Sequence, residues 1–299
     1  MMNIISPVTG KSNVKIVKRI PSEEIISLYK EIGVDTKKYF EDKDIIICKC
    51  KDSLYRFYYP SKLSGDSSFY EDLQKERPTY YSWRWEHEKA LNEIKKDDFV
   101  LDIGCGSGYF LEKLLEKTSN IKGLEYNDIA IKQCREKNIP VVKSDIQHFS
   151  EENVEAFDVI CAFQVLEHIY DIQSFVDSCV RALKPNGKLI IGVPNNNPYL
   201  YKYDINHTLN LPPHHIGLWS KKTLARLPRF FSLKKDNLYI EPNFHYEHWF
   251  NVQINHFFGK TIIGKIVKKM TYRIVKKMNF YIDGRNLLVI YRKDDKKAR

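Results

Sequence analysis

Short apolar runs alternate with amphipathic segments through the middle of this chain, from about residue 99 to residue 193. Five runs have the length and continuous apolar character of parallel strands that are buried on both faces: Phe99–Ile103, Ile121–Glu125, Val141–Lys143, Val159–Phe163 and Lys188–Val193. Three segments between them have helical character: Tyr109–Lys117, Asn127–Lys137 and Ile172–Leu183. Regular alternation of strands and helices predicts a doubly wound α/β fold, in which ligands bind at the carboxyl ends of the strands.

The pattern changes on both sides of this region. Residues 1–78 lack the alternation and contain only short elements. Three are β-like: Val14–Val17, Ile45–Cys48 and Leu54–Tyr59. One is a helix, Ser22–Glu31, which we expect Ser22 to cap. Near the other end, Asn286–Arg292 follows a turn at Asp283 and Gly284 and suits a closing antiparallel edge strand. We therefore predict an N-terminal accessory region, residues 1–78, followed by one larger domain, residues 79–299.

Composition and charge are typical of a globular protein, with 43% hydrophobic and 29% charged residues among 299. No apolar run is long enough for a transmembrane helix, and the N-terminus lacks the apolar core of a secretory signal. Six scattered cysteines indicate reduced thiols, so we expect a cytoplasmic protein. The net charge of +10 is local, because residues 259–299 hold 13 Lys and Arg against three acids. A nucleic-acid partner is not expected, since such proteins more often spread basic residues over the body of the domain.

Three glycines follow the first predicted strand within five residues, at Gly104, Gly106 and Gly108. A dinucleotide fingerprint needs its third glycine at position 109, which is Tyr109, and no Lys-Ser/Thr pair follows to make a phosphate-binding P-loop. The bare backbone allows N–H groups to approach a ligand closely at a helix N-terminus.

Three carboxylates near the ends of successive strands indicate which ligand this is. Asp102 precedes the first glycine and would repel a pyrophosphate. Glu125 ends the next strand and suits two ribose hydroxyls, whereas Asp145 ends the third strand and suits the exocyclic amino group of adenine. Together they describe an adenosine with a cationic amino-acid tail and no phosphates, which is S-adenosylmethionine.

Five motifs resemble, in order and spacing, those of the class I S-adenosylmethionine-dependent methyltransferases: VLDIGCGSGYF, GLEYN, SDIQHF, FDVICAFQVLEHIYD and LKPNGKLIIGVPN. The resemblance implies a Rossmann-like, seven-stranded sheet whose last strand is antiparallel. It also implies roles for matching positions. Gly104, Cys105 and Gly106 would line the methionine portion, and Glu125 would bind the ribose. Tyr126, Asp145 and Ile146 would lie at the adenine, and Gln164 near the methionine amino group.

Candidate catalytic groups follow the fourth strand, where Gln164, Glu167 and His168 have the spacing of one helical face. Transfer to a hydroxyl requires removal of a proton, and His168 is the candidate proton acceptor or substrate contact. The alternative is that Glu167 and His168 only cap and orient the helix. Some O-methyltransferases of quinone biosynthesis and some RNA-terminal methyltransferases have Glu-x-x-Glu-His here and bind a divalent metal with it. Because Gln164 replaces the first acid, which weakens a site for a hard cation, no metal is predicted.

A second candidate stretch, NLPPHHIGLWS, contains His214 and His215, followed by Ser220 as the expected cap of a helix. One of the two histidines is expected to face the substrate; the alternative is a loop histidine that bonds its own backbone. In the bacterial methyltransferases that this chain resembles, the loop after the fifth strand covers the active site, which implies a substrate-covering insertion over residues 196–258. Its tyrosines suit either stacking on a ring or plain packing: Tyr199, Tyr201 and Tyr203.

The N-terminal region resembles the leader of bacterial methyltransferases that often occur with polysaccharide and lipopolysaccharide biosynthesis genes. Such leaders can begin with a zinc knuckle, but Ser6 and Thr9 stand here in place of its thiols, so no structural zinc is expected. Four aromatic residues are expected to pack the leader over the cofactor cleft, or to serve the core alone: Tyr80, Tyr81, Trp83 and Trp85.

The basic segment 259–278 is predicted to be an amphipathic helix. Seven apolar residues share one face: Ile262, Ile263, Ile266, Val267, Met270, Ile274 and Met278. Four lysines lie opposite: Lys265, Lys268, Lys269 and Lys276. Such a helix can make a peripheral contact with an anionic membrane or cover an acidic, lipid-linked substrate. The alternative, which we favour at this point, is a helix packed on the sheet with a solvated basic face.

The expected function is methyl transfer from S-adenosylmethionine to a hydroxyl of a bacterial glycan or glycan precursor. The glycan rests on the resemblance of the leader alone. The alternatives are a quinone-like or other small phenolic acceptor, an RNA acceptor, and a catalytically idle cofactor-binding module. Intact Asp102, Glu125 and glycine triplet argue against an idle module, and the balanced charge of residues 1–258 argues against RNA. The oligomeric state stays open.

Overall fold

A seven-stranded sheet forms the centre of the computed structural model, which describes residues 3–40, 44–60, 63–76, 82–196, 210–244, 246–278 and 281–297. Its strands are, in chain order, β4 (Val100–Ile103), β5 (Ile121–Leu124), β6 (Val141–Val142), β7 (Phe157–Phe163), β8 (Leu183–Pro194), β10 (Leu233–Pro242) and β11 (Asp283–Lys293). The spatial order is β10-β11-β8-β7-β4-β5-β6. Strands β4 to β8 pair in parallel, whereas β11 is antiparallel to both β8 and β10. The predicted doubly wound sheet with an antiparallel last strand is confirmed.

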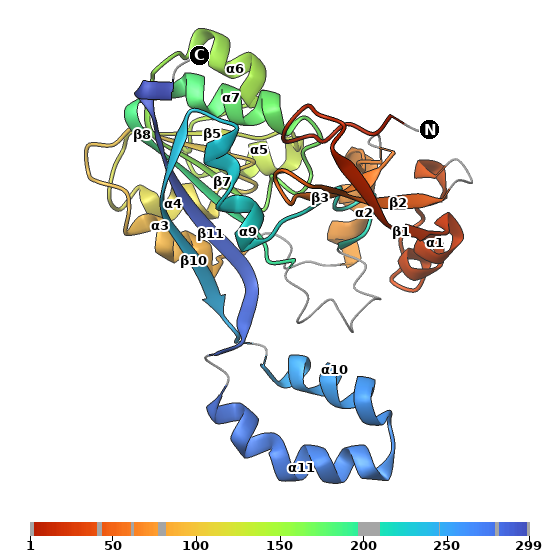
Figure 1. Cartoon of the computed structure of the whole chain (residues 1–299). Helices are drawn as coiled ribbons and strands as arrows, with labels where there is room; N and C mark the ends of the chain where they lie inside the picture. Colours follow the sequence, from red (N-terminus) through yellow and green to blue (C-terminus); the bar gives the residue numbers. More distant parts are fainter. Residues whose placement is uncertain are drawn as a thin grey trace.

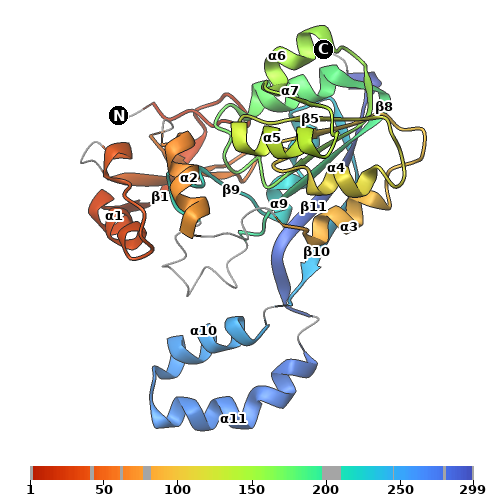
Figure 2. The same ribbon diagram turned by 180° about the vertical axis from the view of Figure 1, so that it is seen from behind.

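Helices cover both faces of this sheet, as Figures 1 and 2 show. They are α3 (Trp85–Leu91), α4 (Tyr109–Leu114), α5 (Asp128–Glu136), α6 (Ile146–Glu152) and α7 (Ile172–Ala182). Because side chains alternate along a strand, Ile160 of β7 packs in the cluster with α6 and α7, while Cys161 packs in the cluster with α3, α4 and α5. Burial on both faces explains why these strands are continuous apolar runs in the sequence.

The N-terminal region forms a second, four-stranded sheet, ordered β1-β2-β3-β9. Its elements are β1 (Val14–Ile20), α1 (Ser22–Lys30), η1 (Lys37–Tyr39), β2 (Ile45–Cys50), β3 (Arg56–Tyr59) and α2 (Ser67–Glu76). The fourth strand, β9 (Gly217–Leu218), comes from beyond β8, so this sheet joins the leader to the larger domain. The expectation that Ser22 caps α1 is wrong, because Pro21 is the N-cap and Ser22 is the first helical residue.

The range 196–258, predicted as one covering insertion, contains three structural parts. A loop with β9, α9 (Lys221–Leu224) and η3 (Leu227–Arg229) lies against the body, and β10 is an edge strand of the main sheet. The chain then forms α10 (Tyr246–Phe258) and α11 (Ile262–Lys277) before it returns as β11. Both views show this helical hairpin standing clear of the sheet, at the ends of β10 and β11 (Figures 1 and 2). The favoured alternative, a helix packed on the sheet, is therefore wrong.

Two further sequence-based expectations bear on these elements. Ser220 caps α9 as predicted, since its side chain accepts a hydrogen bond from the Thr223 N–H. All six cysteines are buried and unbridged, in agreement with reduced thiols. No helix in the described part of the chain is long and apolar enough to cross a membrane.

Candidate active site

A cavity of about 1240 Å³ lies at the carboxyl ends of β4, β5 and β7. Its wall includes the glycine loop on one side and the three candidate histidines on another. Trp83 and Trp85 also line it, as expected of the aromatic segment before α3, whereas Tyr80 and Tyr81 lie outside the described residues. Tyr199, Tyr201 and Tyr203 likewise fall outside them.

The glycine loop between β4 and α4 has a backbone that other residues would strain. Gly104, Gly106 and Gly108 have φ angles of 68°, 54° and 80°, in the left-handed region that favours glycine. A Cβ atom on Gly104 would lie 2.6 Å from Cγ2 of Val165, so the loop also needs the missing side chain for space. These two requirements explain the G-x-G-x-G pattern in physical terms.

Glu125 is held at the end of β5 by three backbone N–H groups. Its Oε2 accepts from the Gly106 N–H at 2.8 Å, and its Oε1 accepts from Tyr126 and Asn127 at 2.7 and 2.9 Å. The carboxylate is thus fixed against the glycine loop with an edge toward the cavity. This position fits a carboxylate that accepts hydrogen bonds from ribose hydroxyls.

Asp102 supplies an unusual second carboxylate at the same place. It is buried, and its Oδ1 has no hydrogen-bond partner within the described ranges. Burial, together with the nearby Glu125, holds the pKa of Asp102 well above its usual range. This buried oxygen lies beside the glycine loop and could accept a hydrogen bond from a donor group of a ligand. The residues present therefore fit S-adenosylmethionine.

The predicted cofactor residues divide into two groups. Seven line the cavity: Asp102, Gly104, Cys105, Gly106, Glu125, Tyr126 and Gln164. Gly108 is the N-cap of α4, and Ile146 is buried under α6. Asp145 caps α6 through the His148 N–H and accepts a hydrogen bond from the Tyr126 hydroxyl at 2.9 Å. Tyr126 therefore stands between Asp145 and the cavity.

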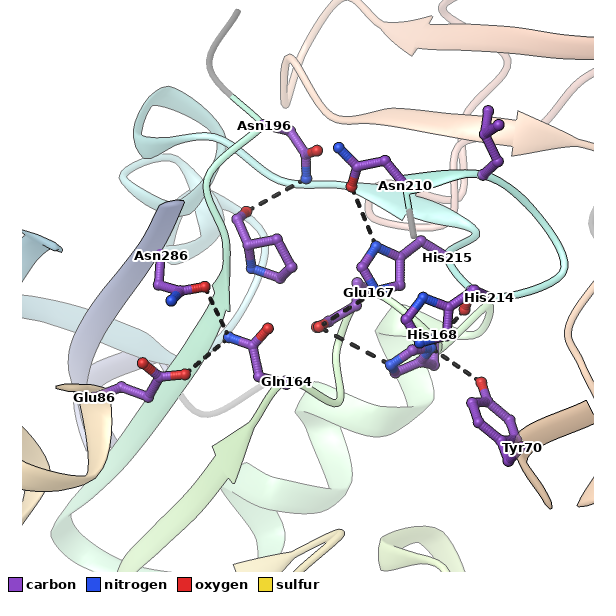
Figure 3. Close-up of polar contacts among 12 residues, drawn as sticks. Tyr70, Glu86, Gln164, Glu167, His168, Asn196, Asn210, His214, His215 and Asn286 are labelled. Atoms are coloured by element: carbon purple, nitrogen blue, oxygen red, sulfur yellow. Dashed lines mark hydrogen bonds and ion pairs between the residues drawn. The ribbon is translucent and has the colours of Figure 1, made fainter. Parts of the chain in front are cut away.

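The segment from Gln164 to His168 is a turn, so the expectation that one helical face carries Gln164, Glu167 and His168 is wrong. Gln164 has a φ of 55°, which redirects the chain at the end of β7. Its side-chain amide donates to Glu86 at 3.0 Å and to Asn286 at 3.4 Å, away from Glu167 and His168 (Figure 3). Glu86, on α3, is buried, and burial raises its pKa.

The fold brings His168 next to His214 and His215, although more than 40 residues separate it from that pair, and both His168 and His215 lie close to Glu167 (Figure 3). The carbonyl of Glu167 accepts the N–H groups of Ile216 and Gly217, which ties the second histidine loop to the first. The Nε2 atoms of His168 and His215 lie 4.0 and 3.9 Å from Oε1 of Glu167. The rings of His214 and His215 stack with centroids 4.2 Å apart.

Hydrogen bonds at the other ring nitrogens orient two of these histidines. The Nδ1 of His168 lies 2.6 Å from the carbonyl of His214, and the Nδ1 of His215 lies 3.2 Å from Oδ1 of Asn210. A carbonyl can only accept, so Nδ1 of His168 carries a proton and its Nε2 is the basic nitrogen. Each Nε2 is therefore directed at Glu167.

Glu167 is the electrostatic centre of this cluster. It is fully buried, and neither carboxylate oxygen has a hydrogen-bond partner in the part of the chain that the structure describes. Burial raises the pKa of Glu167 to about 8, and burial lowers the pKa of His168 to about 4. At neutral pH the pair is thus a protonated carboxyl beside a neutral imidazole, and a neutral imidazole can accept a proton from a substrate.

The same residues fit a divalent cation. His168, His214 and His215 each offer a ligand nitrogen, and these atoms lie within 4.8 Å of one another. The second ring N–H of a metal-bound histidine commonly donates to a carbonyl, as that of His168 does. The prediction that no metal is bound rests on Gln164, Glu167 and His168 alone. Because His214 and His215 also lie beside His168, metal binding should be tested by experiment.

Four residues of the site were not identified from the sequence: Tyr70, Glu86, Asn210 and Asn286. Tyr70 reaches Nδ1 of His168 from α2 at 3.1 Å, and Asn210 orients His215. Their only signal in the sequence is a polar residue next to an apolar segment, which is too common to mark a site.

Comparisons with known proteins agree with this geometry. The model of a family described as "Methyltransferase domain" matches residues 73–233, which is 161 of 299 residues and more than half of the chain. The chain is 31% identical over 127 residues to the ubiquinone biosynthesis O-methyltransferase of Pseudomonas aeruginosa, covering 40% of this chain and 53% of that protein. It is 33% identical over 115 residues to the human mitochondrial ubiquinone biosynthesis O-methyltransferase, covering 36% of this chain and 31% of that protein.

These matches span a third to a half of the length of the curated relatives. A solved SAM-dependent methyltransferase from Archaeoglobus fulgidus has the same fold, with a TM-score of 0.50 at 21% identity over 75% of this chain and 100% of that one. The chain belongs to the methyltransferase-domain family, and the predicted class I fold and its cofactor, S-adenosylmethionine, are confirmed.

Proposed function

We propose that this protein transfers the methyl group of S-adenosylmethionine to a hydroxyl of a small phenolic, quinone-like acceptor. The observation that carries the proposal is the Glu167, His168 and His215 cluster, which lines the same cavity as the glycine loop. The relatives described above are named O-methyltransferases of ubiquinone biosynthesis. They favour a phenolic acceptor over the glycan that the leader suggested.

The cluster supplies what a hydroxyl acceptor needs. When bound, the cofactor provides a methyl group on a positively charged sulfur, which leaves as a neutral thioether. The acceptor oxygen forms the new bond to the methyl carbon and passes its proton to Nε2 of His168 or His215. A phenol has a pKa of about 10, as in tyrosine, whereas burial lowers the pKa of His168 to about 4. The imidazole therefore takes the proton as the new bond to the methyl carbon forms and the hydroxyl becomes acidic, not before.

A divalent cation would serve the same step in a second way. His168, His214 and His215 would hold it, and the nearby Glu167 would then be ionised by the added positive charge. Its chemistry would be to lower the pKa of a hydroxyl bound to it.

The test is methyl transfer from isotopically labelled cofactor, with catechols in one set of assays and nucleotide sugars in the other. The proposal predicts product from catechols, and a loss of kcat on the order of a hundredfold or more in His168→Gln. His148→Gln is the matched control, because the His148 side chain is 83% exposed and does not line the cavity. Activity lost in chelator and restored by Mg²⁺ or Zn²⁺ assigns the cluster to a metal, and chelator-resistant activity assigns it to proton transfer. Methylation of sugars alone, or full activity in His168→Gln, would overturn the proposal.

A further inference from the structure

The hairpin of α10 and α11 exposes an apolar stripe to solvent. Ile262, Met270 and Ile274 on α11 have exposed fractions of 76%, 73% and 61%, and Ile263 and Ile266 are also exposed. Of the 21 large apolar side chains that are exposed in the described part of the chain, ten lie between residues 244 and 281. Single exposed apolar residues are ordinary, but a contiguous stripe on one helix marks an interaction surface.

The stripe is not the face that holds the hairpin together. Phe250 and Ile254 of α10 are buried, and the Phe250 ring lies 6.2 Å from that of Tyr272 on α11. Thr261 caps α11 through the Gly264 N–H, so the turn between the helices is also fixed. The hairpin thus uses one side of α11 for its own packing and leaves the apolar stripe on another.

Basic residues run beside this stripe. Lys265, Lys269 and Arg273 recur every four residues on α11 and are exposed. Between residues 248 and 282 the chain has seven Lys or Arg and no Asp or Glu. A second copy of this chain would set two such rows of like charge against each other, whereas an anionic surface complements them.

We propose that this hairpin lies on an anionic lipid bilayer, with the apolar stripe of α11 in the interface and its basic row at the lipid phosphates. An amphipathic helix with a strongly basic edge binds in this way, through buried apolar area and attraction to anionic headgroups.

The place of the hairpin in the fold supports this orientation. β10 and β11 carry it, and Glu241 and Phe244 at the end of β10 line the cavity, as do Arg285 and Asn286 at the start of β11. The hairpin therefore connects the two strand ends that help to line the cavity. Docking through α11 would therefore act on a segment joined directly to the cavity wall.

The test is co-sedimentation of the full-length protein with vesicles of phosphatidylglycerol and phosphatidylcholine in equal parts, and of phosphatidylcholine alone. The triple variant Lys265→Gln/Lys269→Gln/Arg273→Gln should lower the partition coefficient on the order of a hundredfold, since each basic residue contributes near an anionic surface. The double variant Ile266→Ser/Met270→Ser should also weaken binding, on the order of tenfold. Both variants replace exposed side chains, so cofactor binding should stay unchanged and serve as the folding readout.

The matched control removes the same charge from the body, in the variant Lys113→Gln/Lys132→Gln/Arg135→Gln on α4 and α5. It should bind vesicles like the unmodified protein. Equal binding to both lipid compositions, or equal loss in the control, would overturn the proposal. So would a dimer, measured by light scattering, that the Ile266→Ser/Met270→Ser variant dissociates while the unmodified protein ignores vesicles, because the stripe would then bind a second copy.

Discussion

Replacing Glu167 by glutamine should make the stability of the metal-free protein less sensitive to pH. Burial raises the pKa of Glu167 from 4.5 to about 8, so the folded chain keeps a proton that the unfolded chain has lost. The stability that this protonation provides is fully present below pH 4.5 and is lost as pH rises toward 8. Glutamine has no proton to lose in this range. The variant should therefore gain stability relative to the unmodified protein as the pH increases.

The size of this gain follows from the two pKa values. Between pH 5 and pH 8, the difference in free energy of unfolding between variant and unmodified protein should grow by about 3.5 kcal/mol. At about 2 °C per kcal/mol, the difference in melting temperature should widen by roughly 7 °C. Subtracting the two proteins at each pH removes the contribution of shared titratable groups that lie apart from Glu167.

The measurement is thermal unfolding of both proteins at several pH values between 5 and 8, in chelator. The melting temperature of the variant minus that of the unmodified protein should increase with pH. A value that stays constant or decreases would refute the assignment of a buried, protonated Glu167. Repeating the series with a divalent cation separates the two uses of the cluster. A bound cation would ionise Glu167 and reverse the effect, so the unmodified protein would then be the more stable one.

Three other predictions concern the cofactor site and the leader. Glu125→Gln should weaken S-adenosylmethionine binding on the order of a hundredfold by calorimetry, because charged hydrogen bonds contribute about 1.5–3 kcal/mol each, while the exposed Glu116→Gln should not. Gly104→Ala should lose at least about tenfold in affinity, since its φ is 68° and its Cβ would meet Val165. Gly259→Ala, with a φ of 62° and a nearest neighbour at 3.8 Å, should bind normally. Trp219→Ala should cost about 3–5 kcal/mol of stability in urea unfolding, because this fully buried ring packs 4.4 Å from Tyr55, and Trp219→Phe should cost less. Unchanged unfolding of Trp219→Ala would mean that the ring is not part of the core.

The central sheet could be predicted because burial on both faces leaves a direct trace in the sequence. Val159–Phe163 of β7 and Leu189–Val193 of β8 are continuous apolar runs, and the ordered motifs place the glycine loop and Glu125 at strand ends. β10 could not be predicted because it is an edge strand. Lys234, Lys235 and Asp236 near its start interrupt the apolar run that marks the inner strands. Its partner β11 is antiparallel as predicted, but the expectation that it forms the edge of the sheet is wrong, because β10 pairs with its outer side.

The cluster of candidate catalytic residues could be predicted only as separate candidates. His168 and His215 each follow a recognisable segment, but their convergence depends on backbone bonds from Ile216 and Gly217 to the carbonyl of Glu167, which no sequence pattern encodes. The redirection of Gln164 also depends on a left-handed φ that residues other than glycine rarely adopt. The position of α11 could not be predicted either, since an amphipathic helix has the same sequence pattern whether its apolar face meets a sheet or a membrane.

Because β3 pairs with β9, the N-terminal region directly contacts the segment that follows His214 and His215. Only two residue pairs form this ladder, Arg56 with Leu218 and Phe57 with Gly217, but they directly follow the paired histidines. The hydroxyl groups of Tyr29 and Tyr58 hold the carbonyls of Leu211 and Asn210 just before those histidines. Exchange of this leader between homologous enzymes should consequently change the position of the loop with His214 and His215, which lines the cavity. Substrate preference in such chimeras should follow the parent of the first 76 residues, even though the candidate cofactor residues Asp102 and Glu125 lie in the other part.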